Sequence, residues 1–501
     1  MAKSQYVLAH DLGTSGNKAT LFDGDGKMVM SARRSYKTRY PKPGYVEQEP
    51  ADWWRAVCET TVELLEAGAV KPGQIACVAM CGHMMGCVLT GADGGALRPA
   101  IIWADTRAAK QERDMLAAVG MEEGYRITGH RLSASYTAAK LLWIKDNEPS
   151  VYAAGEKALN AKDYILYRLT GNYVSEYSDA SGTNLFDLSG LRWADGILRE
   201  LGIRESLMPE LHASTDVVGG LTGEAAAACG LLAGTPIVAG GGDGSCACVG
   251  AGAVNVGDVY GIMGSSSWIS SVAEKPLFDP DFRVFSWSHL DSKLYAPCGT
   301  MQAAGVSAQW FADMLSPDGG SVEEANSLAA ESRPGANGLI YLPYLLGERS
   351  PRWDIEARGA FVGLSATTTR ADMARAVAEG VGMNLRMIID CLGVEAGKTI
   401  TMIGGGAESD FWMGVFADIW NRKIALPEYL SEATSLGAAL AGGIGVGVYG
   451  GFGDIAKMNR INKTIEPGGS RAAVYDALTP AFDAAYEGLR AANSLLASIR
   501  Q

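Results

Sequence analysis

Histidine, paired cysteine and positive charge are scarce in this chain of 501 residues. The five histidines are widely scattered, and no two of the nine cysteines form a CxxC unit, so the sequence offers no zinc-type ligand set. The cysteine count is odd, and the first residues resemble no signal peptide, since Met-Ala-Lys-Ser-Gln leads directly into an apolar run. We therefore expect reduced thiols and a cytoplasmic protein.

The shortage of basic residues bears on possible partners. Lys and Arg number 43 against 56 Asp and Glu, which gives a formal net charge of −13. This excess of negative charge disfavours nucleic acid and anionic membranes as partners. It does not disfavour small anionic ligands, because a local nest of backbone N–H groups can hold them.

Long uninterrupted hydrophobic runs are missing as well. Two uncharged stretches, 225–242 and 436–453, approach the length of a membrane span. The second contains eight glycines, and the first contains Gly234 and Pro236. We interpret both stretches as buried segments of small residues and expect no membrane insertion.

Glycine and apolar residues are abundant. Glycine accounts for 63 positions, many of them clustered in turns, and 48% of the chain is hydrophobic. A chain of this length and composition predicts two to four well-packed domains and excludes intrinsic disorder.

The N-terminal segment predicts strands joined by tight turns. Apolar runs at 6–10, 19–22 and 28–30 indicate three strands, and Asp-Gly-Asp-Gly at 23–26 is typical of a hairpin turn. A helix is expected over 50–66, with a proline in its first turn and a glycine shortly after its end.

An internal repeat suggests a duplicated architecture. The segments 235–243 and 399–407 each run from an apolar strand into three glycines and a helix, and Gly/Ser/Thr turns occur at 13–16 and 264–267. We therefore expect two similar α/β domains, residues 1–250 and 251–501, packed around a cleft.

The turn at 11–18, Asp-Leu-Gly-Thr-Ser-Gly-Asn-Lys, is the first candidate for chemistry. Its glycines let backbone amides approach an anion, and Thr14 and Ser15 add hydroxyl donors. Asp11 is suited to Mg²⁺, and Lys18 adds positive charge. The alternative interpretation is a plain hairpin turn.

Asp243 follows three glycines at a predicted helix start. This position suits a carboxylate beside a closely approaching ligand, and it equally suits a helix cap. The matching turn, Gly404-Gly-Gly-Ala407, has no carboxylate and suits a base or ribose better than acid–base chemistry. The segment 393–399 resembles a phosphate-binding P-loop, but it is one residue short and precedes a strand, so we reject it.

Two further loops follow apolar strands. His83, Met84 and Met85 come after the run 75–80, and Trp103 and Asp105 come after another. Loops at strand ends commonly contact substrate. The alternatives are a core histidine with gap-filling methionines, and a core indole beside a surface ion pair of Asp105 with Arg107.

Taken in order, these blocks carry a family resemblance. The segments 11–18, 103–107 and 240–243 are similar to those of the FGGY carbohydrate kinases. Ser135-Tyr-Thr-Ala-Ala-Lys140-Leu-Leu-Trp143 resembles the first family signature, and 359–379 nearly matches the second. The block Leu342-Pro-Tyr-Leu-Leu-Gly-Glu348-Arg349 is shared too, so the resemblance extends over most of the chain.

The resemblance implies two actin-like (ribonuclease-H-like) α/β domains flanking a deep catalytic cleft. The N-terminal domain would bind the sugar and supply the base, and the C-terminal domain would bind ATP. A homodimer would be in keeping with the family. The implied substrate-binding residues are His83, Met84, Met85, Trp103, Asp105 and Asp243.

The resemblance also implies roles around ATP and Mg²⁺. Asp243 would be the general base, and it would hold the metal together with Asp11. Residues near the phosphates would be Thr14, Ser15, Lys18, Gly264 and Ser265. The residues lining the nucleotide site would be Gly305, Gln309, Gly405, Gly406 and Ala407.

The loop at 82–86 bears on which sugar is used. The chain is most like the xylulokinase branch, whose sugar loop reads Gly-Gln-Met-His-Gly, whereas this loop reads Gly-His-Met-Met-Gly. The thioether of Met85 is a poor hydrogen-bonding partner for a sugar hydroxyl. We expect a pentulose-like ketose or alditol that need not be D-xylulose. Other ketoses or alditols (ribulose, erythritol), a chaperone-like ATPase and a non-catalytic regulatory protein remain as alternatives.

Overall fold

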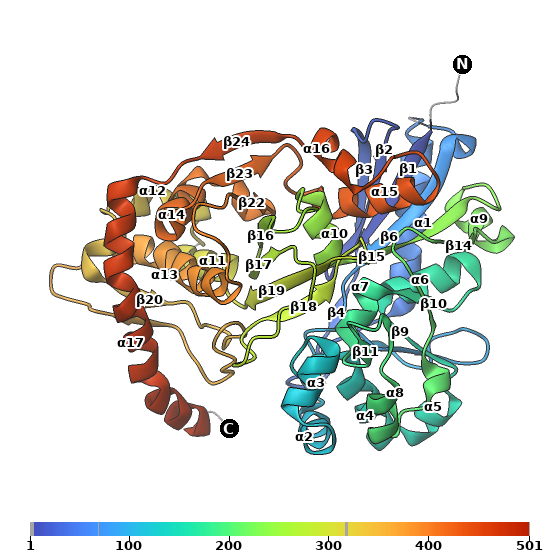
Figure 1. The fold of residues 1–501 in the computed structure, drawn as a ribbon, viewed down its shortest axis with the longest axis horizontal. Coiled ribbons are helices and arrows are strands. Elements are labelled where there is room, and N and C mark those ends of the chain that lie inside the picture. Colours follow the sequence, from blue (N-terminus) through green and yellow to red (C-terminus); the bar gives the residue numbers. More distant parts are fainter. Residues whose placement is uncertain (1–4, 69, 316–318, 500–501) are drawn as a thin grey trace.

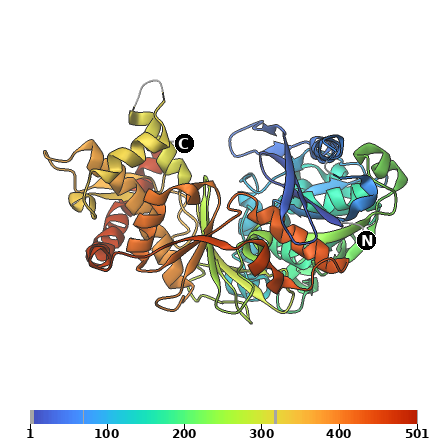
Figure 2. The same cartoon turned by 90° about the horizontal axis from the view of Figure 1, so that it is seen from above.

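The computed structural model describes residues 5–68, 70–315 and 319–499, which form two lobes, each built on one large sheet (Figures 1 and 2). The strand order of the first sheet is β14-β15-β6-β1-β2-β3. Its strands are β1 (Tyr6–Leu12), β2 (Gly16–Phe22), β3 (Met28–Ser35), β6 (Ile75–Gly82), β14 (Val217–Gly220) and β15 (Pro236–Gly242). The helices before the second sheet are α1 (Pro50–Glu66), α2 (Ala109–Ala118), α3 (Met121–Thr128), α4 (Thr137–Asn147), α5 (Pro149–Ala154), α6 (Ala161–Thr170), α7 (Tyr177–Ala180), α8 (Asp195–Glu200), α9 (Gly223–Cys229) and α10 (Asp243–Gly250).

The second sheet has the order β18-β19-β17-β16-β22-β23-β24. Its strands are β16 (Val259–Met263), β17 (Ser267–Ser271), β18 (Phe285–Ser288), β19 (Tyr295–Met301), β22 (Ile400–Ile403), β23 (Ile424–Pro427) and β24 (Ile461–Ile465). The helices of this half of the chain are α11 (Gly305–Leu315), α12 (Val322–Ala330), α13 (Arg370–Cys391), α14 (Asp410–Trp420), α15 (Ala433–Gly445), α16 (Ile455–Met458) and α17 (Gly469–Ile499).

The two sheets share one pairing pattern. In the first, β1 pairs antiparallel with β2 and parallel with β6, and β15 pairs parallel with β6 and antiparallel with β14. In the second, β16 pairs antiparallel with β17 and parallel with β22, and β23 pairs parallel with β22 and antiparallel with β24. The expected pair of similar α/β units is therefore present.

The repeat predicted from sequence is right for the hairpin turns and wrong for the triple glycines. The turns at 13–15 and 264–266 join equivalent strands, β1–β2 and β16–β17. Gly240 lies in β15, however, whereas Gly404 follows β22, the equivalent of β6. Both glycines have positive φ, +68° and +87°, and each lies against the backbone of the neighbouring strand. Both positions therefore require glycine for the same local reason, and this similarity resembles a repeat although the strands are not equivalent.

Local sequence signals predicted the first helix and the first three strands correctly. The expected helix over 50–66 is α1, with Pro50 in its first turn. The expected strands are β1, β2 and β3, but each continues beyond its apolar run. Asp11 and Lys18 consequently lie within paired strands, and the turn between them contracts to residues 13–15.

Helix α15 joins the two lobes. Although it comes late in the chain, it packs on β1, β6 and β15 of the first sheet and on α10 (Figure 1). The two helices touch backbone to backbone, because a Cβ at Gly437 would collide with the Cys246 carbonyl, and one at Gly250 with the Ala433 carbonyl. The uncharged stretch 436–453 thus begins, through Gly445, as helix, and most of this helical part is buried, in agreement with the predicted buried segment of small residues.

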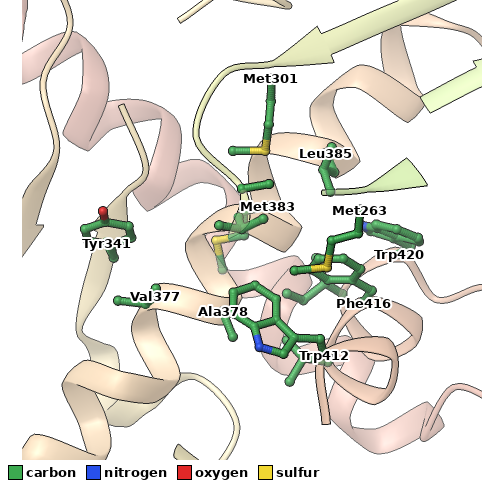
Figure 3. Packing of buried hydrophobic residues seen from close by; sticks show 14 of the residues in the cluster. Met263, Met301, Tyr341, Val377, Ala378, Met383, Leu385, Trp412, Phe416 and Trp420 are labelled. Atoms are coloured by element: carbon green, nitrogen blue, oxygen red, sulfur yellow. The ribbon is translucent and has the colours of Figure 1, made fainter. Parts of the chain in front are cut away.

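The core of the second lobe surrounds α13 and α14 (Figure 3). Trp412, Phe416 and Trp420 recur along one face of α14. The first two rings meet edge to face and the last two stack, with ring centroids 5.8 and 4.8 Å apart. Met263, at the end of β16, belongs to the same cluster. The core therefore supports the β16–β17 turn from below. Within the part of the chain that the structure describes, no helix combines the length and apolarity that a membrane crossing requires.

Candidate active site

A cavity of about 210 Å³ lies between the two sheets, and we call it the interlobe cavity. The first lobe contributes residues from the β1–β2 turn, from the loop after β6 and from the start of α10. The second lobe contributes residues from β17, β18, β19 and the loop after β20 (Ile340–Leu342). The lining residues are Thr14, Met84, Met85, Trp103, Asp243, Gly244, Ser266, Trp268, Trp287, Cys298, Thr300, Gln302 and Arg349.

The strand register explains how distant residues meet here. In the parallel neighbours β1 and β6, Asp11 pairs with Cys81, and in β6 and β15, Gly242 pairs with Gly82. The carboxyl ends of three adjacent parallel strands therefore deliver Asp11, the loop at 82–86 and Asp243 to one edge of the sheet. The sequence analysis named all three of these groups.

Asp243 is the first residue of α10, and Gly242 is the N-cap. Its Oδ1 accepts a hydrogen bond from the Gly244 N–H at 2.8 Å, and the side chain faces the interlobe cavity. Burial by the surrounding protein, and secondly the charge of Asp11, raise the pKa of Asp243 to about 7. A carboxyl group with a pKa near neutrality can accept a proton effectively at physiological pH.

Asp11, the penultimate residue of β1, lies close enough to this carboxylate for its charge to act on it. The Cys81 thiol donates to Asp11 Oδ1 at 3.5 Å. Burial raises the pKa of Asp11, and the charge of Lys18 opposes that rise. Among the described residues, no group of three or more His, Cys, Asp or Glu is arranged to hold a metal ion. Mg²⁺ commonly uses only one or two carboxylates with water and phosphate oxygens, so the pair Asp11 and Asp243 fits it.

The other residues predicted in the 11–18 turn have distinct surroundings. Thr14 lines the cavity, and its Oγ1 accepts a hydrogen bond from Trp103 Nε1 at 2.9 Å. Ser15 is exposed and its Oγ accepts from Arg33 Nη2 at 3.1 Å. Lys18 Nζ donates to the Ser431 carbonyl at 2.6 Å, just before α15. Lys18 thus links the two halves of the chain.

Some of the predicted substrate residues line the interlobe cavity, and others are buried behind those that do. Met84, Met85 and Trp103 line the cavity, whereas His83 and Asp105 are absent from its lining. His83 is buried, its ring lies edge-on to Trp53, and neither ring nitrogen has a hydrogen-bond partner among the described residues. Burial lowers the pKa of His83 to about 4.

Asp105 is fully buried in an ion pair with Arg107, and their closest N–O distance is 2.7 Å. Its Oδ2 also accepts from the Val46 N–H at 2.5 Å. This is the ion pair that the sequence analysis held as an alternative, although it lies inside the protein rather than on its surface. Asp105 therefore backs the wall that carries Trp103.

A second, glycine-lined cavity of about 670 Å³ lies between the β16–β17 turn, α11, α12 and the turn at 405–408. Six of the predicted cofactor residues line it together: Gly264, Ser265, Gly305, Gln309, Gly405 and Gly406. Ala407 is buried beneath them. Asn326, Ser409 and Trp412 also line it, and none of the three was predicted from sequence.

Several residues of the interlobe cavity escaped the sequence analysis. Trp268, Trp287 and Thr300 come from β17–β19, antiparallel strands that carry no motif. Cys298 and Thr300 are two residues apart on β19, so their side chains lie on the same face of the sheet. This spacing does not show what that face contacts. Arg349 lies in a block that the family resemblance includes, but no role was attached to it.

Comparisons with known proteins agree with this geometry. Residues 6–250 match the N-terminal domain, and 259–446 the C-terminal domain, of the FGGY family of carbohydrate kinases. The xylulose kinase of Bacillus subtilis is 35% identical over 457 residues, 91% of each chain. The glycerol kinase of Thermococcus gammatolerans is 31% identical and covers 93% of this chain and 94% of its own.

Solved structures reproduce the two-lobed arrangement. The gluconate kinase of Lactobacillus acidophilus superposes with a TM-score of 0.93 at 28% identity, covering 98% of this chain and 100% of its own. The xylulose kinase of Rhodospirillum rubrum gives 0.89 at 32% identity with the same coverage. The chain therefore has the two-domain, actin-like kinase fold and belongs to the FGGY family of carbohydrate kinases.

Proposed function

We propose that this sugar kinase transfers the γ-phosphate of ATP to a hydroxyl of a small, pentulose-like sugar bound in the interlobe cavity. The observation that carries the proposal is Asp243: a carboxylate with a pKa near 7 faces a cavity to which both lobes contribute. The similarity to xylulose kinases supports a pentulose-sized substrate.

Asp243 would act as the general base. Its carboxylate would accept the proton of the attacking hydroxyl, a role that carboxylates fill in phosphoryl transfer. Thr14, and the backbone amides of the turns at 13–15 and 264–266, would position the phosphates. Such fixed dipoles stabilise charge that develops during transfer.

Asp11 and Asp243 would hold Mg²⁺. The negative charge of Asp11 contributes to the raised pKa of Asp243, which reflects repulsion between the two carboxylates. A divalent cation relieves that repulsion, and when bound it neutralises negative charge on the phosphate oxygens.

The glycine-lined cavity would take the nucleotide. Gly264 and Ser265 would face phosphates, and Gln309, Gly405 and Gly406 would face the base and ribose, with Ala407 supporting them from below. The volume of about 670 Å³ suits a nucleotide. Residues 1–250 would then supply sugar binding and the base, and residues 251–501 the nucleotide site.

The wall at Met84 and Met85 favours a second candidate substrate class. Two thioethers line the cavity where a polar sugar contact is expected, and the indole nitrogen of Trp103 is already bonded to Thr14. A ketose or alditol that presents no hydroxyl to this wall would lose no hydrogen bond there on leaving water. Hydrogen-bonding sites reject analogues that leave polar groups unpaired, so such walls decide between sugars.

The test is coupled ADP release with Mg-ATP over pentuloses, hexuloses, pentitols, tetritols and glycerol. We expect one strong responder among the five- or four-carbon compounds. Asp243→Asn should lower kcat on that compound at least about 100-fold because it removes the base. Sugar binding, followed by the fluorescence of the cavity tryptophans, should persist.

Asp216→Asn is the matched control. Its Oδ2 accepts from the Ala213 N–H at 3.0 Å in a surface turn, and an amide oxygen can keep that bond. This substitution removes one negative charge, as Asp243→Asn does, but residue 216 lines neither cavity. The variant should therefore keep the parental kcat. Near-parental kcat in Asp243→Asn would refute the assignment of the base, and a folded, ATP-binding parent that phosphorylates none of the panel would refute the substrate class.

A further inference from the structure

Helix α4 carries a buried lysine that contacts the wall of the interlobe cavity from behind. Lys140 is 0% exposed. Its Nζ donates to the Met85 carbonyl at 2.9 Å and also to the carbonyl of Ser135, two residues before the helix. One turn earlier, Thr137 Oγ1 donates to the Gly86 carbonyl at 2.8 Å. Two side chains of α4 therefore hold two successive carbonyls of the loop at 82–86.

Packing alone gives no reason for a lysine at this position. Among the described residues, no carboxylate lies within 4.0 Å of Nζ, so backbone oxygens alone receive its charge. Burial lowers the pKa of Lys140 to about 7, and the cations Arg107 and Arg349 act in the same direction, while Asp105 opposes them. Burying an ammonium group costs several kcal/mol, whereas an apolar side chain would bury here at a gain.

The neighbours of Lys140 on α4 show that the site would accept an apolar residue. Ala138, Ala139, Leu141, Leu142 and Ile144 are all buried. A methionine in place of Lys140 would continue that apolar face with a similar volume. The bonds to the loop therefore distinguish lysine from the apolar residues around it.

The loop needs such support because Met85 is strained. Met85 has φ +64°, a left-handed conformation that non-glycine residues rarely adopt. Such a conformation persists only where the surrounding structure fixes it. The carbonyl that Lys140 holds belongs to Met85 itself, and the one that Thr137 holds belongs to the next residue. The strain lies in the wall of the cavity, next to Met84.

We propose that Lys140 is a positioning residue for the sugar: through the Met85 carbonyl it fixes the left-handed turn that presents Met84 and Met85 to the interlobe cavity. The inference rests on the proposed function of that cavity as the sugar site. Lys140 does not line the cavity, and it acts through the loop rather than on the substrate.

The test compares Lys140→Met with Lys145→Met. Lys145 lies on the same helix, and its Nζ also donates to backbone carbonyls, those of Gly202 at 2.7 Å and Leu201 at 3.3 Å, but away from the loop. We expect Lys140→Met to raise the sugar KM about tenfold, the effect of losing a charged hydrogen bond. The ATP KM should stay within about twofold, and kcat should change less than the sugar KM. Lys145→Met should keep both KM values.

Hydrogen exchange gives a second readout that needs no substrate. Peptides covering 82–88 should exchange faster in Lys140→Met than in the parent, and at the parental rate in Lys145→Met. If the parent phosphorylates no sugar of the panel, the proposed function fails while exchange still tests the loop. Parental sugar KM together with parental exchange in Lys140→Met would overturn the role of Lys140.

Thr137→Val keeps the test decisive if Lys140→Met does not fold. Valine has nearly the shape of threonine and removes only the hydroxyl that holds the Gly86 carbonyl. We expect a smaller rise in sugar KM, about threefold, with faster exchange in the same peptides. Parental values for both quantities in Thr137→Val would overturn the inference that α4 fixes this loop.

Discussion

At the scale of single residues, Met85 is the position that we expect to govern the choice of sugar. It lines the interlobe cavity where the xylulokinase branch carries histidine. Met85→His should raise kcat/KM for D-xylulose about 3- to 10-fold relative to the parent, because an imidazole can hydrogen-bond a hydroxyl that a thioether cannot. Histidine also tolerates the left-handed φ of +64° at this site. Steady-state kinetics on D-xylulose and on the preferred compound measure the change.

Met85→Leu is the control for this substitution. Leucine preserves an apolar side chain of similar volume without adding a donor or acceptor. It should leave kcat/KM for D-xylulose within about twofold of the parent. An unchanged ratio of the two substrates in Met85→His, with the protein folded, would show that position 85 does not set selectivity.

Sequence alone identified the residues that meet at strand ends. Asp11, Thr14 and Asp243 were predictable because each follows an apolar strand in a glycine-rich context, and the parallel register of β1, β6 and β15 brings them together. The same rule also selected His83, which lies one residue before the cavity wall, is buried and does not line the cavity. A loop pattern states where the chain turns, but not which side chains point outward.

At the scale of elements, the contact of α10 with α15 places Asp243. A methyl group at Gly437 would meet the Cys246 carbonyl in the middle of α10, and a backbone atom cannot move aside as a side-chain tip can. Gly437→Ala should therefore destabilise the protein by about 1–3 kcal/mol, the usual effect of overpacking. It should also lower kcat, because α10 begins at Asp243. Urea unfolding and steady-state kinetics provide the two measurements.

Gly414→Ala separates this packing effect from helix propensity. Gly414 lies within α14, and nothing lies within 4 Å of the Cβ that it would gain. Alanine there should stabilise the protein by up to about 1 kcal/mol, because it is the better helix former. Equal changes in stability for the two variants would show that α10 and α15 tolerate a wider separation.

For the segment that forms α15, the sequence indicated burial but not the packing partner. Its uncharged, glycine-rich composition predicted a buried small-residue segment, and glycine at 437 fits a close helix contact. Nothing local indicated that this late helix packs on the first sheet. The misread triple-glycine repeat has the same origin, because residues 240 and 404 satisfy similar backbone demands on strands that are not equivalent. Long-range pairing is the information that local patterns lack.

At the scale of the whole molecule, buried ionisable groups of opposite sign shape the pH dependence of stability. Burial lowers the pKa of His10 and His83 to about 4 and that of His130 to about 3. Burial raises the pKa of Asp243 to about 7 and that of Glu348 to about 8. As pH falls from 8 to 5, the unfolded chain protonates its histidines first, which destabilises the fold, whereas the folded carboxyl groups protonate first, which stabilises it. The two contributions oppose each other in the parent.

His83→Phe isolates one histidine from that balance. At pH 8 the imidazole is neutral in both states, so the substitution there changes only the packing against Trp53 and removes two buried nitrogens that have no partner among the described residues. At pH 5 the unfolded parent holds a proton at this site and the folded parent does not, which costs the parent about 2 kcal/mol. The variant should therefore gain about 2 kcal/mol of unfolding free energy relative to the parent between pH 8 and pH 5. Urea unfolding at both pH values measures the difference, and the same difference at each pH would mean that water or a protein group reaches the ring and lets it protonate in the folded state.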